Sequence, residues 1–158
     1  SSGLLELARH PDQAAILRRD PEAFKSGASE ETLRSRPAIT GVGQKSATAL
    51  EAFDIQLEAG TPLMVSLGSA NRDPRNFEDP ERFDITRDPK RTSLTFGIGA
   101  HVCLGHAMAR ATVEEALAVF VERCDEIELV GEARWTPFVM ENKLEGLELA
   151  FAGRDEAR

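Results

Sequence analysis

The chain has 158 residues, of which 41% are hydrophobic and 29% charged, a composition that excludes a disordered or fibrous protein. Its net charge of -8 argues against general nucleic-acid binding, which usually relies on a basic face. No stretch approaches the roughly 20 consecutive apolar residues of a membrane span, and residues 1–3 lack the marks of a signal peptide. The only two cysteines, Cys103 and Cys124, cannot build a disulfide framework, which favours a cytoplasmic protein.

Short helices separated by prolines are expected in the first part of the chain. Apolar residues predict one helix over residues 4–8, which Pro11 should end, and a second helix over residues 12–18. Ser29 is the expected N-cap of a third helix over residues 30–34, whose first turn is acidic as the helix dipole favours. The helical pattern begins at once and without an initiator Met, so the sequence is expected to be a fragment.

Strand patterns replace the helical ones over residues 39–67. Residues 53–57 alternate apolar and polar side chains, and residues 63–67 form a second apolar run after a turn at residues 58–62. Together they predict an antiparallel hairpin. Residues 71–92 are rich in proline and charge, which predicts an irregular but ordered loop.

The clearest element is an amphipathic helix over residues 104–124. Its apolar side chains recur at three- and four-residue steps, and Cys124 falls on this stripe and is expected in the core. Residues 127–130 and 147–151 are predicted strands with a loop between them. The predicted elements are thus short helices, a small hairpin, one long helix and two further strands.

Residues 96–105, Phe-Gly-Ile-Gly-Ala-His-Val-Cys-Leu-Gly, carry the strongest chemical signal. Cys103 lies at the mouth of the long helix, where free backbone N–H groups and the positive end of the dipole stabilise a thiolate. Phe96 adds an aromatic edge beside the sulfur. Nearby glycines allow unusual dihedral angles and the close approach of a flat ligand. These glycines are Gly97, Gly99 and Gly105.

This stretch resembles the haem-binding loop of the bacterial-type cytochrome P450 family. The matching positions are Phe96, Gly99, His101, Cys103 and Gly105. Two further matches precede it in the family's order: Glu31 and Arg34 resemble its Glu-x-x-Arg helix motif, and residues 80–83 resemble the loop that docks on that helix. The resemblance therefore covers nearly the whole chain and implies that residues 1–158 are the C-terminal haem-binding portion of a P450 domain. The implied fold is the C-terminal part of the family's mainly helical α+β fold, with small antiparallel sheets.

The resemblance implies a role for each matching residue around the haem. Cys103 would bind the iron through sulfur, and His101 would form a hydrogen bond to a haem propionate. The arginine that usually binds the other propionate is missing here. Gln44 or Lys45 occupies that region, and a lysine offers a point charge without the bidentate fork of arginine.

A structural role is implied for the upstream motifs. Glu31 and Arg34 are three residues apart and therefore share a helix face, where they can pair. Arg82, in the docking loop, is expected to join them in a charged cluster that fixes the loop beneath the haem.

The family's activity is mono-oxygenation, in which one atom of O2 enters a small organic substrate. The implied cofactor is haem b, with electrons from NAD(P)H delivered by a ferredoxin or flavoprotein. The family's acid–alcohol pair on the distal helix has no counterpart here, so no catalytic residue is assigned. Residues 136–139 are the one stretch expected to contribute to a substrate pocket, although Phe138 could equally be core.

Three other interpretations stay open from the sequence alone. Taken by itself, Cys103 could be a small buried residue at a helix start. The chain could also be a truncated product that is not catalytic. A zinc module built on His101, Cys103 and His106 is the third, although structural zinc usually has four protein ligands.

Overall fold

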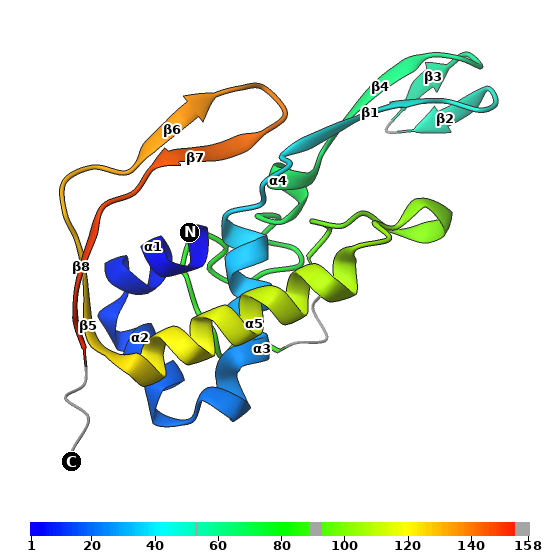
Figure 1. The fold of residues 1–158 in the computed structure, drawn as a ribbon. Coiled ribbons are helices and arrows are strands. Elements are labelled where there is room, and N and C mark those ends of the chain that lie inside the picture. Colours follow the sequence, from blue (N-terminus) through cyan, green and yellow to red (C-terminus); the bar gives the residue numbers. More distant parts are fainter. Residues whose placement is uncertain (53, 89–92, 154–158) are drawn as a thin grey trace.

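The computed structural model describes residues 1–52, 54–88 and 93–153. Its helices are α1 (Ser2–Arg9), α2 (Pro11–Arg19), α3 (Pro21–Ser35), α4 (Leu67–Ala70) and α5 (His106–Arg123), with a 3₁₀ helix η1 (Gly99–His101) before α5. The helices α1, α2, α3 and α5 pack together, and we call them the helical base (Figure 1). Proline occupies the first position of α2 and of α3, where its missing N–H leaves no bond unmade. None of the helices in the described part of the chain is long and apolar enough to cross a membrane.

The third helix begins earlier than predicted. Asp20 caps it, because its side-chain Oδ1 accepts a hydrogen bond from the backbone N–H of Ala23 at 3.1 Å. Ser29, the predicted N-cap, lies inside α3 and is fully buried. Its hydroxyl donates to the carbonyl oxygen of Arg110 in α5 at 3.3 Å, so it joins two helices instead of starting one.

Gly27 explains why only residues 30–34 of this continuous helix were predicted. Glycine is a poor helix former, so it lowers the helical signal of the sequence around it. Here it is required by packing: a Cβ at Gly27 would lie 2.1 Å from the carbonyl oxygen of Ile85. The loop therefore passes so close to α3 that only glycine fits.

The core lies where α1, α2 and α3 pack on α5. Its buried members are Leu7, Ala14, Leu17, Ala28, Phe83, Ile85, Leu117 and Val121. Burial of a side chain such as Leu17 contributes about 1.5–3 kcal/mol to the free energy of unfolding. Phe83 and Ile85 come from the irregular loop, and their burial attaches residues 71–88 to the helices as an ordered segment, while residues 89–92 of the predicted loop lie outside the described residues.

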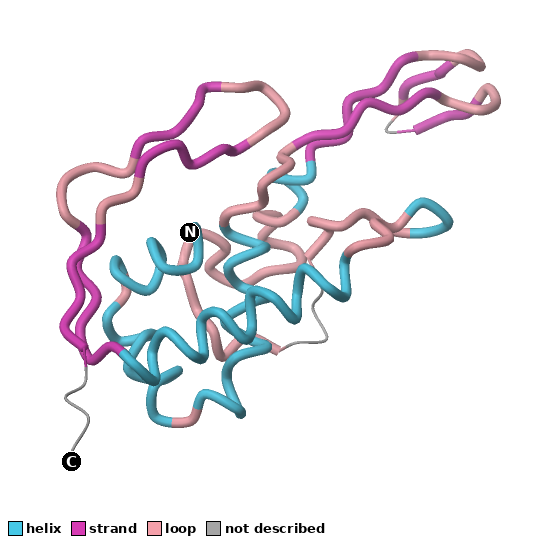
Figure 2. The backbone as a smooth tube through the Cα atoms, in the orientation of Figure 1, coloured by secondary structure: helices cyan, strands magenta, loops and turns pink. Residues whose placement is uncertain are grey.

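Strands pair in four two-stranded antiparallel sheets among the described residues. The pairs are β1 (Gly41–Lys45) with β4 (Pro62–Ser66), β2 (Leu50–Ala52) with β3 (Ile55–Leu57), β5 (Cys124–Leu129) with β8 (Leu149–Gly153), and β6 (Arg134–Pro137) with β7 (Asn142–Gly146). Figure 2 shows β1 and β4 as a long ribbon that carries β2 and β3 at its far end. The mainly helical α+β fold with small antiparallel sheets is thus confirmed.

The predicted pairing of residues 53–57 with residues 63–67 is wrong. Phe53 lies outside the described residues, and β3 pairs with β2 whereas β4 pairs with β1. Ser46 gives the physical reason, because its buried hydroxyl donates to the carbonyl of Glu58 at 2.6 Å and accepts from the N–H of Thr61 at 3.0 Å. These bonds hold the start of β4 against the end of β1.

The C-terminal strands are found where they were predicted, as β5 and β8. The segment between them was predicted as a loop, but it contains the hairpin β6–β7. Cys124 is buried as expected, yet it is the first residue of β5 and not part of α5.

Candidate functional site

Residues 94–106, called here the Cys103 loop, join the irregular segment to α5. The backbone N–H of Cys103 donates to the carbonyl of Phe96 at 2.9 Å, and the Cys103 carbonyl accepts from the N–H of His106 at 3.1 Å. Gly105 is the N-cap of α5. The loop therefore closes on itself around Cys103, whose side chain is exposed and not engaged in a disulfide.

Gly97 and Gly99 leave open space beside the backbone of the Cys103 loop. Gly97 has a φ angle of 72° and Gly99 one of 77°, in the left-handed region that favours glycine. A Cβ at either position would meet no atom within 4 Å, so the volume beside them is empty. Gly105, also predicted to need an unusual dihedral angle, has an ordinary φ of -84°. Its Cβ would lie 4.0 Å from Cys103 Sγ, so glycine keeps the space around the sulfur free.

Large apolar side chains of the Cys103 loop and of the first turn of α5 are uncovered. Leu104 is 100% exposed, Ile98 74% and Met108 75%. A cluster of large apolar side chains in contact with water favours an apolar ligand or partner at that surface. The exposed thiol, the open glycines and this apolar rim together fit a large flat apolar group bound through sulfur.

The other predicted site residues lie at different places. Phe96 belongs to the loop, where its half-buried ring faces that of His106 with 6.4 Å between centroids. His101 is the exposed last residue of η1, in the same loop. Lys45 is exposed at the end of β1 opposite Pro62. In Figure 1 the β1–β4 ribbon and the Cys103 loop extend from the helical base toward the same side of the view.

Beneath the loop is a buried ion pair. Arg34 donates twice to Glu31, from Nε at 2.7 Å and from Nη2 at 2.8 Å, and only 2% and 3% of the two residues are exposed. The guanidinium also donates to the backbone carbonyls of Asn71, Pro80 and Arg82, at 2.9, 2.7 and 3.2 Å. Such a bidentate pair, with its remaining donors satisfied, is the arrangement in which a buried charge is tolerated.

The prediction that the Arg82 side chain joins this pair is wrong. That side chain is 62% exposed and its nearest carboxylate is Asp84 at 3.8 Å. Arg87 takes the position instead: its Nε donates to Glu31 Oε1 at 3.1 Å, and its Nη2 donates to the carbonyls of Asp79 and Arg82 at 2.8 Å each. Only the backbone of Arg82 takes part, because the chain turns at Asp79, whose φ is 44°.

Asn71 precedes the predicted docking loop, but no role was assigned to it from the sequence. It is fully buried, and its carbonyl accepts from Arg34. Its side chain donates to Thr95 Oγ1 at 3.0 Å and accepts from the N–H of Leu94 at 2.7 Å. Asn71 thus connects the ion pair to the Cys103 loop. We call Glu31, Arg34, Asn71 and Arg87 the Glu31 cluster.

The predicted pocket segment, residues 136–139, lies beside residues 38–40, which lead into β1. The N–H of Thr40 donates to the carbonyl of Met140 at 2.9 Å, and the N–H of Asn142 donates to Ala38 at 2.8 Å. Phe138 and Val139 extend into solvent, 59% and 89% exposed, so Phe138 is not a core residue.

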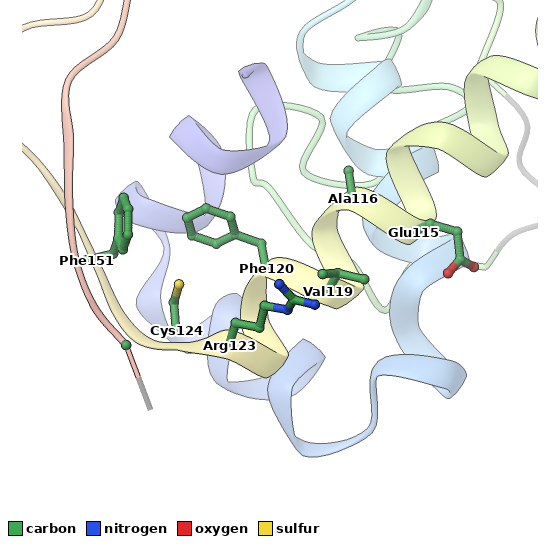
Figure 3. Close-up of a pocket in the computed structure, with 8 residues that line it drawn as sticks. Glu115, Ala116, Val119, Phe120, Arg123, Cys124 and Phe151 are labelled. Atoms are coloured by element: carbon green, nitrogen blue, oxygen red, sulfur yellow. The ribbon is translucent and has the colours of Figure 1, made fainter. Parts of the chain in front are cut away.

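A hollow of about 650 Å³ lies elsewhere. It lies at the C-terminal end of α5, opposite the end that carries Cys103 (Figure 3). Phe120 and Phe151 line it with their rings edge to face, 5.6 Å apart.

The described residues contain no group of three or more His, Cys, Asp or Glu side chains arranged to hold a metal ion. His106, one ligand of the zinc alternative, has its Nδ1 engaged 3.0 Å from Arg110 Nη1. The geometry therefore gives no support to the zinc module and leaves Cys103 as a single exposed thiol.

Comparison with known proteins gives one consistent family. The family model described as Cytochrome P450 matches residues 27–139. Cytochrome P450 107B1 of Saccharopolyspora erythraea is 39% identical over 148 residues, which cover 91% of this chain and 36% of that protein. The 6-deoxyerythronolide B hydroxylase of the same organism is 39% identical over 127 residues, covering 80% of this chain and 31% of that protein.

Solved structures agree with the sequence comparison. The crystal structure of P450BioI in complex with an acyl carrier protein matches with a TM-score of 0.90 and 33% identity, over 96% of this chain and 39% of that one. CYP109Q5 from Chondromyces apiculatus matches with a TM-score of 0.87 and 32% identity, over 96% and 39%. The chain thus spans well under half the length of these relatives.

Proposed function

Because this chain belongs to the cytochrome P450 family, we propose that it forms the proximal side of the haem site in a haem-thiolate mono-oxygenase, with Cys103 as the iron ligand. The observation that carries the proposal is an exposed thiol in a closed, glycine-containing loop with an uncovered apolar rim. The Glu31 cluster supports the loop from below through Asn71. In this proposal residues 1–158 are the C-terminal haem-binding portion of the domain.

The cofactor proposed for this site is haem b. The loop residues Phe96, Gly99 and Gly105 would face the macrocycle, where the open space beside Gly99 admits a flat group. His101 and Lys45, both exposed, would serve the two propionates as hydrogen-bond donor and point charge. When bound, a thiolate-ligated haem supplies the activation of O2.

In this proposal the chain holds the iron ligand Cys103 in place and shields its sulfur from water. The loop would hold the Cys103 thiolate at the N-terminal end of α5, where free backbone N–H groups favour a negative charge. Ile98, Leu104 and Met108 would exclude water from the sulfur once they are covered. Because Cys103 must remain a free thiol, we place the protein in the reducing cytoplasm.

The substrate class proposed is a small organic molecule. Phe138 and Val139 are exposed apolar residues beside the strand that leads into β1, and they would contribute to the substrate pocket. Electrons would come from NAD(P)H through a ferredoxin or flavoprotein. Residues that activate oxygen on the opposite haem face are not assigned in this chain, so complete turnover requires them from elsewhere.

Carbon monoxide spectroscopy tests the iron ligand directly. After reconstitution with haem and reduction, the protein should show the red-shifted band of a thiolate-ligated iron. Cys103→Ala should abolish that band, whereas Cys124→Ala should keep it because Cys124 is buried at the start of β5. Failure of every preparation to take up haem would instead support a truncated, non-catalytic product. Stoichiometric zinc in the purified protein would support a metal-binding module.

A further inference from the structure

Arg110 lies where α3, α5 and the Cys103 loop meet. Its Nε forms an ion pair with Glu30 of α3, and its Nη1 lies 3.0 Å from Nδ1 of His106. The centre of the guanidinium is 4.8 Å from the centroid of the Phe96 ring, a cation–π contact. One side chain therefore contacts both ends of the loop.

We propose that Arg110 is a positioning residue for Cys103. The inference rests on the proposed function, because it assigns a role to Arg110 in the same site. Cys103 forms its two backbone hydrogen bonds with Phe96 and His106, the residues whose side chains Arg110 contacts. By holding these two side chains, Arg110 fixes the backbone on both sides of the thiol.

The chemistry of the contacts requires an arginine. A guanidinium has only donors, so Nδ1 of His106 must accept the hydrogen bond. The same planar group can lie over the Phe96 ring while its edge donates to His106 and Glu30. A lysine carries the same charge, but as a point it can serve only part of this set.

Arg110 is itself held by α3. Glu30 binds its guanidinium, and the buried Ser29 donates to its backbone carbonyl at 3.3 Å. Glu30 and Glu31 are adjacent, yet they serve different sides of α3: Glu31 binds Arg34 and Arg87, and Glu30 binds Arg110. The helix thus supports the loop by two independent routes.

Amide hydrogen exchange of the haem-free chain tests this role. In Arg110→Met the N–H groups of Cys103 and His106 should exchange faster by about 3- to 30-fold, because the cation–π contact with Phe96 is lost together with the contact to His106. The amide of the buried Val121 should not change, which separates local loosening from global unfolding. Equal exchange at Cys103 and His106 in Arg110→Met and the unchanged protein would overturn the proposal.

Arg123→Met is the matched control. It removes the same charge from the same helix about 20 Å further along, at an exposed position, so both loop amides should keep their exchange rates. Equal acceleration by Arg123→Met and Arg110→Met would also overturn the proposal, because it would show a general charge effect.

Substitution within the cluster distinguishes positioning from a plain helix–helix ion pair. Arg110→Lys should restore part of the protection, since a cation still lies near the Phe96 ring. The double variant with Glu30→Arg and Arg110→Glu rebuilds the ion pair with its charges swapped. It also turns a carboxylate toward the negative face of the Phe96 ring, so the protection of the loop amides should stay lost. Full recovery in that double variant would show that the ion pair alone matters and would overturn the role assigned through Phe96.

The haem-loaded protein separates this inference from the proposed function. Arg110→Met should bind haem but convert a larger part of its reduced carbon monoxide complex to the unshifted band, while Arg123→Met keeps the red-shifted band. An unshifted band in the unchanged protein would refute Cys103 ligation, and the exchange rates would still decide whether Arg110 positions the loop.

Discussion

The Glu31 cluster and the Cys103 loop are neighbours joined by Asn71, but their exposure to water is opposite. Glu31 and Arg34 are almost fully buried, and every donor group of the Arg34 guanidinium has a partner. Cys103 is exposed, and Leu104 beside it is completely uncovered. In the cluster, buried polar groups satisfy one another; in the loop, apolar groups and a thiol remain free. The difference indicates which region maintains the fold and which is available to a ligand.

Of the substitutions proposed for the Glu31 cluster, Glu31→Ala should destabilise the folded protein most. It leaves Arg34 as an uncompensated buried charge and removes the acceptor of Arg87 and of the Asp84 N–H. We expect a loss of about 3–5 kcal/mol in the free energy of unfolding, measured by urea denaturation. Glu22→Ala, which removes a 79% exposed carboxylate from the same helix, should cost at most about 0.5 kcal/mol. Equal urea midpoints for the two variants would contradict the structural role of Glu31.

Asn71→Ala should weaken the connection between the Glu31 cluster and the Cys103 loop. It removes the acceptor of the Leu94 N–H and the donor to Thr95, and both lost partners are at least partly buried. We expect a cost of about 2 kcal/mol, with faster amide exchange at Leu94 than in α2. Gln56→Ala is the control, because its exposed amide bonds to Glu51 across β2 and β3. Unchanged exchange at Leu94 would show that the loop does not depend on the cluster.

Arg87→Met should cost more than Arg82→Met, although Arg82 lies in the sequence motif. Arg87 loses a charged hydrogen bond to Glu31 and several to backbone carbonyls, for which we expect about 1.5 kcal/mol. Arg82 has its side chain in solvent, so its loss should stay within about 0.5 kcal/mol. Thermal or urea unfolding of the two variants measures the difference. A larger loss for Arg82→Met would restore the motif-based assignment.

Arg82 and Arg87 also show what could be predicted from the sequence. Glu31 with Arg34, and Phe96 with Cys103, were identified because each pair is separated by a short, fixed spacing that local structure preserves. The positions of Arg82 and Arg87 depend on how the loop turns at Asp79, which no local pattern encodes. Local chemistry was therefore predictable, but not the partner supplied by a distant loop.

The strands follow the same rule. Residues 53–57 and 63–67 were predicted as strands from their apolar pattern. Their partners were predicted wrongly, because Ser46 decides the pairing from a distant position in the chain. Helix α3 was predicted too short. Gly27 lowers the helix propensity of its first part, but in the structure Gly27 packs closely on Ile85 within one continuous helix. Such long-range contacts override local propensity, and they become visible only in the folded chain.

Asp73 and Arg75 form an ion pair whose arginine is exposed to water, whereas the ion pair of Glu31 and Arg34 is buried. Loss of the Asp73–Arg75 pair should therefore affect stability less. Hydrogen bonds from the Arg75 guanidinium, with one from its backbone N–H, lower the pKa of Asp73 from 3.8 to about 2. Because the folded pKa is depressed, the stabilisation is present above the unfolded pKa of about 3.9 and is lost as the pH falls through about 2.

Arg75→Met should return the pKa of Asp73 to about 3.9, measured by NMR titration of its carboxyl carbon. Arg75→Met should therefore also lower the stability at neutral pH, but by less than the variants of the Glu31 cluster, since Arg75 is exposed and water screens the pair. Arg75→Lys keeps the charge without the fork and should give an intermediate pKa. If Asp73 of the unchanged protein titrates near 4, the exposed pair is open in solution, and only burial as in the Glu31 cluster keeps such a pair closed.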